Sequence, residues 1–251
     1  MTDADAVNDW LRPDWPAPAH VRALVTTRDS GVSRDAYASL NLGAHVGDDP
    51  AAVAENRRRL VEAAALPAEP IWLSQVHGLG VAKLAADSKP GIEADAAMTD
   101  SPGVVCAVLT ADCLPVLFCD RLGTRVAAAH AGWRGLAGGI LEASVEAMDT
   151  PPEDLHAWLG PAIGPAAFEV GDEVREAFVA RHPAANTAFI PSPAGRWLAD
   201  LYTLARLRLA ACGVRSVHGG GECTFTDAQR FYSYRRDGDT GRMASLVWIQ
   251  H

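Results

Sequence analysis

The sequence predicts a mixed α/β protein of the α+β type, a single domain built as a layered sandwich of mixed sheets with outer helices. Short apolar segments typical of strands outnumber the helical patterns. They do not alternate regularly with helices, which disfavours a doubly wound parallel sheet. The 251 residues contain no internal repeat and no clear linker, so we expect one domain over residues 20–251, preceded by a lead-in over residues 1–19.

The lead-in carries three prolines, Pro13, Pro16 and Pro18, and little periodicity, so we expect it to be extended. A first strand is predicted over residues 21–27. The loop-like stretch 31–49 follows, with several glycine and asparagine turn signals.

A helix is predicted to begin at Pro50. Asp49 precedes it as a capping residue, and proline suits the first helical position. Val53, Leu60 and Ala64 then mark one apolar face at helical spacing.

The remaining strands are predicted in short apolar segments, most of which contain β-branched or aromatic residues. They cover residues 71–77, 81–85, 104–110, 114–119, 125–130, 155–159, 214–217 and 245–249.

Three further helices are predicted from apolar patterns, and Gly213 is placed to end the last of them. They cover residues 135–148, residues 172–181 and a segment whose apolar face carries Trp197, Leu201, Leu204 and Ala205.

Composition restricts the partners and the compartment. Thirty-one acidic against 22 basic residues give a net charge of −9, which argues against a dedicated nucleic-acid binder. No apolar stretch approaches a membrane span, and the acidic start does not resemble a signal peptide. Five cysteines without a CxxC pair indicate a reducing compartment. We therefore expect a cytoplasmic monomer with no membrane or nucleic-acid partner.

Common catalytic signatures are absent from the sequence, among them GxxxxGK[ST], GxGxxG after a strand, HExxH and GxSxG. Nucleotide hydrolysis by a P-loop, Rossmann redox chemistry, zincin proteolysis and α/β-hydrolase chemistry are accordingly disfavoured.

Two of the eight histidines stand out, because each ends a predicted strand close to a glycine: His77 in QVHG and His130 in AHAG. Cys113 lies in the polar break between two further predicted strands. Two imidazoles and a thiolate form a good zinc ligand set, and three protein ligands leave a fourth position for water or substrate. The alternative is that Cys113 is a small buried hydrophobic residue.

Arginines provide a second indication. Arg134 follows His130 in GWRG, where a predicted helix begins, and a guanidinium beside helix amides suits an anion. Arg235 and Arg236 form a second pair, whereas Arg57 lies on an amphipathic helix, where arginines more often face solvent. The pattern suggests phosphate or another anionic substrate.

These segments together resemble the YfiH-like family, also called laccase-domain proteins or multicopper polyphenol oxidases, and more recently peptidoglycan editing factors and purine nucleoside phosphorylases. The similarity runs in order over nearly the whole chain from residue 21. The matching stretches are SLNLGAHVGDD (39–49), QVHG (75–78), VLTADCLPVLF (108–118), AAAHAGWRG (127–135), WLGPAIGP (158–165), FEVGDEV (168–174), GGGECTFTD (219–227) and FYSYRRDGDTGRMASLVWI (231–249).

The resemblance implies a layered α/β sandwich whose metal ligands, and catalytic residues, are His77, Cys113 and His130. It implies phosphorolysis of purine nucleosides, namely adenosine, inosine and methylthioadenosine, with adenosine deamination as a second activity and a role in editing peptidoglycan precursors. We expect zinc rather than copper as the cofactor. The residues expected to contact nucleoside or phosphate are Asn41, His45, Arg57 and Arg134.

Two other functions compete with this one. A multicopper oxidase needs many closely spaced histidines, and the chain contains no HxH and no methionine just after Cys113. A metal-free hydrolase of cell-wall precursors would use Cys113 as nucleophile and His130 as base, but would leave His77 without a role.

Overall fold

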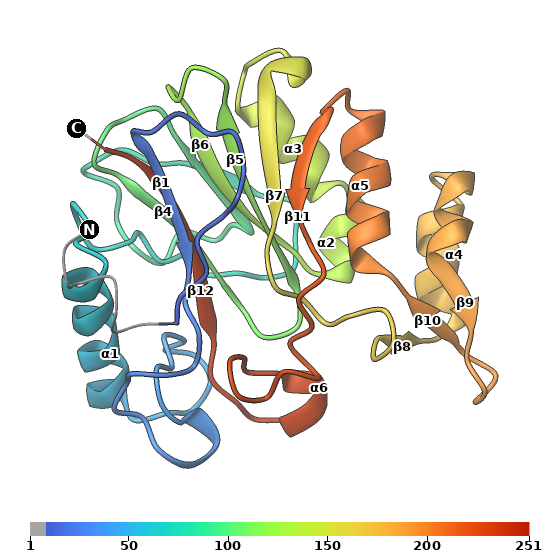
Figure 1. Cartoon of the computed structure of the whole chain (residues 1–251), viewed down its shortest axis with the longest axis horizontal. Helices are drawn as coiled ribbons and strands as arrows, with labels where there is room; N and C mark the ends of the chain where they lie inside the picture. Colours follow the sequence, from blue (N-terminus) through green and yellow to red (C-terminus); the bar gives the residue numbers. More distant parts are fainter. Residues whose placement is uncertain (1–8, 251) are drawn as a thin grey trace.

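Two β-sheets packed face to face form the centre of the protein, and helices cover the outer face of each (Figure 1). The computed structural model describes residues 9–250. The prediction of a mixed α/β sandwich is confirmed. The expected division at residue 20 stays a prediction, and residues 1–8 and 251 lie outside the described part.

The smaller central sheet is antiparallel and has the order β1-β12-β4. The larger has the order β11-β7-β5-β6-β3-β2 and is mixed, because its two edge pairs are parallel. The strands are β1 Val21–Val25, β2 Val81–Lys83, β3 Ala96–Thr99, β4 Val105–Thr110, β5 Leu114–Asp120, β6 Val126–Ala131, β7 Leu155–Leu159, β11 Ser216–Gly219 and β12 Met243–Ile249.

Helix α1 covers the outer face of the smaller sheet, and α2, α3 and α5 cover the outer face of the larger. A small third sheet, β8-β10-β9, lies beside α4 at one side of the molecule (Figure 1). The bounds are α1 Pro50–Ala63, α2 Trp133–Gly138, α3 Ile140–Ala147, α4 Asp172–Val179, α5 Leu201–Ala211, α6 Tyr234–Asp237, β8 Glu169–Val170, β9 Phe189–Pro191 and β10 Trp197–Ala199. Within residues 9–250, three short 3-10 turns cover Asp35–Tyr37, Pro152–Asp154 and Pro183–Ala188.

Alternating side chains of the central strands fill separate cores. In β4, Val105 and Leu109 face α1, whereas Cys106 and Val108 pack against the larger sheet. Because successive strand residues point to opposite faces, a strand buried on both sides is apolar throughout. The continuous apolar runs seen in the sequence are therefore the middle layers of the sandwich.

Asp49 caps α1 as expected, since its carboxylate accepts a hydrogen bond from the backbone N–H of Ala51. Val53 and Leu60 are buried, Leu60 packs against the sheet, and the buried Asn56 lies between them.

Three predicted elements were wrong. Residues 71–77 form no strand; they make one isolated bridge, between Ser74 and Glu93. The single helix expected over 135–148 is two helices, because Gly139 has a left-handed φ of 116°. Trp197 belongs to β10 and not to a helical face, and helix α5 begins only at Leu201, after the cap of Asp200.

Short strands were also missed. β3, β8, β9 and β10 are four residues long or shorter, and such lengths carry too little periodicity to be recognised. The lead-in is partly paired, since Leu11 exchanges two backbone hydrogen bonds with Val25. Within residues 9–250, no helix has the length and apolar character needed to cross a membrane.

Truncation of a central strand residue tests the packing. Leu117 of β5 is fully buried between the sheets, so Leu117→Ala is expected to lower the free energy of unfolding by about 3 kcal/mol through lost contacts and a cavity. Leu122, in the turn after β5, is 72% exposed, and Leu122→Ala should change it by less than about 0.5 kcal/mol. Urea unfolding of both variants provides the measurement, and equal effects would contradict the layer assignment.

Candidate metal centre

The fold brings His77, Cys113 and His130 together. Their ligand atoms all lie within 4.8 Å of one another, and within residues 9–250 this is the one group of three or more such side chains that meets this condition. His77 Nε2 lies 4.0 Å from Cys113 Sγ. The two imidazole rings meet edge to face, with centroids 4.7 Å apart.

The three side chains come from different structural settings. Cys113 lies in the bend between β4 and β5, and His130 is in β6, near its end. His77 does not end a strand; it lies in a turn with a φ of 60°, which is unusual for a residue with a side chain. Gln75 explains why no strand forms there, because its side-chain amide bonds both the N–H and the carbonyl of Leu109 and replaces a backbone ladder.

A buried carboxylate holds the turn. Asp95 is 0% exposed, and its Oδ1 accepts hydrogen bonds from the backbone N–H of His77 at 2.9 Å and from His130 Nδ1 at 2.8 Å. Its Oδ2 accepts from the N–H of Gly78 at 2.6 Å and of Val76 at 3.2 Å. Asp95 therefore orients one ligand directly and the other through its backbone, and it leaves His130 Nε2 free for the cluster.

Gly132 provides the room for the cluster. A Cβ at this position would lie 3.0 Å from Cys113 Sγ, 3.1 Å from His77 Cδ2 and 3.4 Å from His130 Nε2. Any side chain here would press on all three ligands, so the backbone itself forms one wall.

The charges within the cluster favour an ionised thiol. Burial raises the pKa of Cys113, but the neighbouring His130 and His77 outweigh burial and lower it to about 6. Burial likewise raises the pKa of Asp95, but the hydrogen bonds from His130, Gly78 and Val76 lower it to about 2. At neutral pH, a thiolate and a carboxylate therefore flank His130.

The donor set fits a zinc ion. Zinc bonds of about 2.0–2.3 Å in tetrahedral geometry place ligand atoms roughly 3.4–3.6 Å apart. The observed Cys113–His77 separation of 4.0 Å needs only a small contraction. The Asp95–His130 pair is the carboxylate–histidine arrangement that supports zinc ligands elsewhere.

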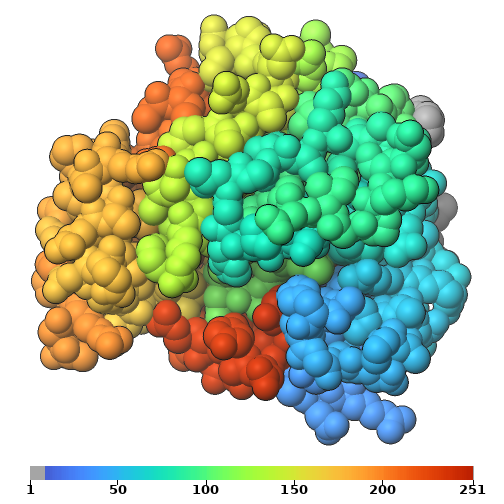
Figure 2. Space-filling view, turned by 180° about the vertical axis from the view of Figure 1, so that it is seen from behind, coloured from blue at the N-terminus to red at the C-terminus, as the bar shows by residue number. Residues whose placement is uncertain are grey.

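The cluster lies in the wall of a cavity of about 360 Å³. Beside the three candidate ligands, its lining includes His45 and Arg242, which lie near opposite ends of the sequence. The other lining residues are Gln75, Leu109, Thr110, Ala111 and Tyr234. In the view from behind, the blue N-terminal segment and the red C-terminal segment lie together beneath the green and teal middle of the chain (Figure 2).

Arg242 gives the cavity its positive charge, and His45 lines the same cavity in its neutral form. Burial lowers the pKa of His45, and the positive charges of Arg242 and Arg57 lower it further, so His45 is neutral at pH 7. Arg242 Nη1 donates to the carbonyls of Thr240 and Gly241. No other described residue hydrogen-bonds its Nε or Nη2.

Thr110 adds an unpaired polar atom to this cavity. Thr110 is 2% exposed, and its Oγ1 has no hydrogen-bond partner among the described residues. A buried hydroxyl without a partner is costly, so this atom indicates a contact that a bound molecule or water completes.

The predicted substrate residues are distributed differently from expectation. Of the four, His45 alone lines this cavity. Asn41 is fully buried behind it, where its Oδ1 accepts from the backbone N–H of Gly43 and of Arg242. Asn41 thus fastens the His45 loop to the Arg242 segment.

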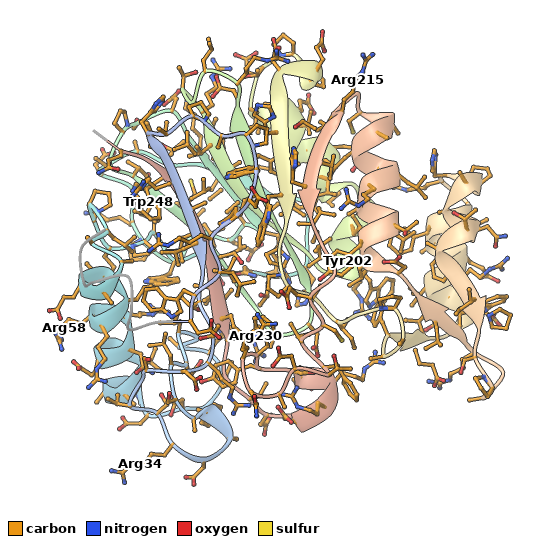
Figure 3. All side chains as sticks on the ribbon, viewed as in Figure 1. Arg34, Arg58, Tyr202, Arg215, Arg230 and Trp248 are labelled. Carbon is orange, nitrogen blue, oxygen red and sulfur yellow. The ribbon has the colours of Figure 1, made fainter. Side chains whose placement is uncertain are left out.

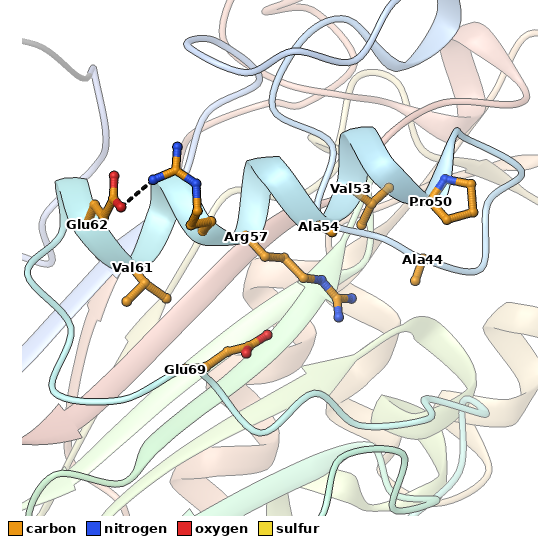
Figure 4. A pocket seen from close by; sticks show the side chains of 9 residues that line it. Ala44, Pro50, Val53, Ala54, Arg57, Val61, Glu62 and Glu69 are labelled. Atoms are coloured by element: carbon orange, nitrogen blue, oxygen red, sulfur yellow. Dashed lines mark hydrogen bonds and ion pairs between the residues drawn. The ribbon is translucent and has the colours of Figure 1, made fainter.

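Arg57 and Arg134 lie away from the cavity wall. Arg57 faces a separate groove of about 500 Å³ between α1 and the segment with Glu69 (Figure 4), and its guanidinium bonds the carbonyl of Leu42 and stacks on Trp72. Arg134 is exposed and stacks on its neighbour Trp133.

Three residues of the site were not predicted: Asp95, Thr110 and Arg242. Asp95 is flanked directly by alanines in EADAAM, and an acid inside such an apolar stretch is a sign of a buried carboxylate. Thr110 and Arg242 lie inside segments noted only for strand character or resemblance, and no pattern marks their position in the cavity.

Comparison with known proteins establishes the family. The family described as multi-copper polyphenol oxidoreductase laccase matches residues 22–250. The chain belongs to this YfiH-like, laccase-domain family. Its members include a purine nucleoside phosphorylase of Pseudomonas aeruginosa, 63% identical over 245 residues that make up 97% of this chain and 100% of that protein. The purine nucleoside phosphorylase YfiH of Escherichia coli is 57% identical over 94% of this chain and 97% of its own.

Crystal structures of family members share the fold. A protein of Neisseria meningitidis aligns with a TM-score of 0.92 and 54% identity, covering 97% of this chain and 100% of that one. YlmD of Geobacillus stearothermophilus aligns with a TM-score of 0.93 and 34% identity, covering 98% and 97%.

Substitution of the supporting carboxylate tests the metal centre. Asp95→Asn keeps the size of the side chain but removes the charge that orients His130, so zinc affinity is expected to fall about 10- to 100-fold. Competition with a chromogenic chelator measures the affinity, and circular dichroism verifies the fold. Asp100→Asn, which removes an exposed partner of Lys83, is the control and should bind zinc as the wild type does. Wild-type affinity in Asp95→Asn would contradict the assignment.

Proposed function

We propose that this protein is a zinc-dependent purine nucleoside phosphorylase, which transfers the ribosyl group of adenosine, inosine or methylthioadenosine to phosphate. The observation that carries the proposal is the open His77–Cys113–His130 cluster in the wall of a cavity that also holds the half-buried Arg242. The names of the two relatives above support the same chemistry.

A single zinc fits these residues better than several coppers. Within residues 9–250 there is one group of three donors, whereas a multicopper oxidase needs several. No methionine lines the cavity, and the amide of Gln75 is already bonded to Leu109, which leaves no obvious axial copper ligand. When bound, zinc would supply a Lewis acid that offsets negative charge beside the reacting atoms.

Arg242 is the proposed phosphate-binding residue, in place of Arg57 and Arg134. It lines the cavity, its Nη1 is held by two carbonyls, and its Nε and Nη2 make no hydrogen bond with the described residues. A fixed guanidinium can hold two phosphate oxygens and orient a third toward C1′ of the ribose. Arg57 and Asn41 are then positioning residues, because each acts on the loop that carries His45.

His45 is proposed to contact the departing purine. As the bond between C1′ and N9 breaks, negative charge develops on the base. The lowered pKa of His45 makes it a neutral hydrogen-bond donor at pH 7 rather than a reservoir of protons. Its N–H can stabilise the charge on a ring nitrogen, while solvent or phosphate supplies the proton.

Adenosine deamination and peptidoglycan precursor editing are proposed as further uses of the same cavity. A cytoplasmic location is proposed as well, in keeping with five free cysteines. The competing hydrolase would use Cys113 and His130 without a metal. The lowered pKa of Cys113 is compatible with it, so chelation is the experiment that separates the two: the phosphorylase loses activity and regains it with zinc, whereas the hydrolase is unaffected.

Loss of one ligand tests the proposed function. His77→Ala is expected to reduce the formation of ribose 1-phosphate from inosine and phosphate by about 10³-fold or more, because the cluster then lacks one of its three donors. His77 is exposed, so the fold should persist by circular dichroism. His182→Ala, outside the cavity, is the matched control with unchanged activity. Full activity in His77→Ala would overturn the proposal.

The unpaired hydroxyl gives a second test. Thr110→Val removes Oγ1 at nearly constant volume, so kcat/KM should fall about 5- to 10-fold through the loss of one hydrogen bond to bound substrate. Thr27→Val is the matched control, because Thr27 Oγ1 is also buried and unpaired but does not line the cavity. A fall of the same size in both variants would show that the effect is not a substrate contact.

A further inference from the structure

A second polar cleft lies at the far end of the larger sheet. Its volume is about 770 Å³, and its lining includes His156, Ser216, His218, Arg121 and Arg215. Strand β5 runs from beside Cys113 to Asp120, just before Arg121, and its length separates the two ends of the sheet by roughly 20 Å. Arg215 accordingly appears at the upper end of the molecule in Figure 3, whereas α6, beside the metal centre, is at the lower end in Figure 1.

Strand pairing places a serine between two imidazoles. Ser216 of β11 lies opposite His156 of the parallel neighbour β7. Its Oγ lies 2.8 Å from His156 Nδ1 and 2.8 Å from Nε2 of His218, two residues further along the same strand. The three side chains therefore share one face of the sheet and form a continuous hydrogen-bonded chain.

The hydrogen-bonding capacity of the three side chains shows what happens when the His156–Ser216–His218 network gains one proton. The hydroxyl of Ser216 can donate to only one imidazole, so the other must donate to it. With both rings neutral, the two outward ring nitrogens are one donor and one acceptor, in either arrangement. One added proton turns the acceptor into a donor and keeps both bonds to Ser216. The His156–Ser216–His218 network with one added proton thus presents two N–H donors to the cleft.

Two arginines add positive charge to the same cleft, and Glu153 is the one acidic residue in its lining. Arg215 is exposed and has no hydrogen bond or ion pair with any described residue. Arg121 is paired with Asp154, with Nε 3.2 Å from Oδ1, and its Nη2 donates to the carbonyl of Glu153. A cation is disfavoured here, since within residues 9–250 no third donor approaches the two imidazoles closely enough to complete a metal site.

We propose that this cleft is a second ligand site, which binds a phosphoryl group between Arg215, Arg121 and the His156–Ser216–His218 chain and takes up one proton on binding. The proposal is independent of the function of the metal centre.

The charges around His156 agree with proton uptake on binding. Burial lowers its pKa, and Arg121 and His218 lower it further, while Asp120 and Asp154 act in the opposite direction. The empty cleft therefore holds His156 neutral at pH 7. A bound dianion adds negative charge and raises that pKa, so protonation and binding favour each other.

Histidine NMR spectra of the full-length protein provide the test, because the ring resonances of His156 and His218 report on this cleft and not on the metal centre. His156→Gln and His218→Gln assign the signals. Sulfate is the first probe, since it stays a dianion over the whole pH range. Both resonances should shift on titration, and the apparent affinity should fall by up to about tenfold per pH unit as pH rises above the pKa of His156 in the free protein.

Matched variants distinguish specific anion binding by these side chains from non-specific attraction by surface charge. Ser216→Ala breaks the chain and should weaken sulfate binding and flatten its pH dependence, whereas Ser216→Thr keeps the hydroxyl and should behave as the wild type does. Arg215→Ala should weaken binding several-fold, and Arg34→Ala, at the opposite end of the molecule (Figure 3), should not.

Two further titrations identify the kind of molecule that carries the phosphoryl group. Inorganic phosphate and adenosine 5′-monophosphate are titrated under the same conditions: similar affinities indicate free phosphate, and tighter binding of the nucleotide indicates a phosphorylated metabolite. The proposal is overturned if neither histidine signal responds to any of the three anions, if Ser216→Ala binds as Ser216→Thr does, or if zinc and not an anion shifts both signals.

Discussion

The four hydrogen bonds accepted by the buried carboxylate of Asp95 organise the metal centre. Three come from the backbone of residues 76–78 and one from His130, and the backbone carbonyl of Asp95 also accepts from the N–H of His130. The unusual backbone of His77 is maintained by these bonds, because a positive φ costs energy that the surrounding structure must offset. A charge buried at this depth is stable only when it is fully paired, so the same bonds stabilise the fold and set the ligand geometry.

The sequence predicted the sandwich and singled out His77, Cys113 and His130, which the fold brings together, but it did not predict that Asp95 connects them. Val105 and Leu117 belong to apolar runs long enough to be recognised as buried strands. His130 and Cys113 were correctly placed at strand ends. His77 was wrongly placed at the end of a strand. The side chain of Gln75 takes the place of backbone hydrogen bonds between strands there, and a side-chain substitute of this kind leaves no periodic pattern in the sequence. Asp95 contacts residues 17 to 35 positions away, and a contact of that kind is defined only by the folded chain.

The cavity combines segments from both ends of the chain. Asn41 and Arg57, which the sequence predicts as substrate contacts, make hydrogen bonds that fasten the loop that brings His45 to the cavity. Neighbouring residues of that loop line two different hollows. Ala44 lines the outer groove beside α1, and His45 lines the inner cavity. Arg242 follows α6 and faces His45, and this pairing could not be predicted because it depends on β12 lying between β1 and β4. The resulting site has one wall formed by the His77–Cys113–His130 group, which could hold a metal ion, and one cationic wall formed by Arg242.

X-ray absorption at the metal edges of the purified, unmodified protein tests this account most directly. The account predicts one zinc per chain, with one sulfur neighbour at about 2.3 Å and two imidazole nitrogens at about 2.0 Å, together with a light-atom neighbour from solvent. Several coppers per chain, or a zinc with no sulfur neighbour, would contradict it.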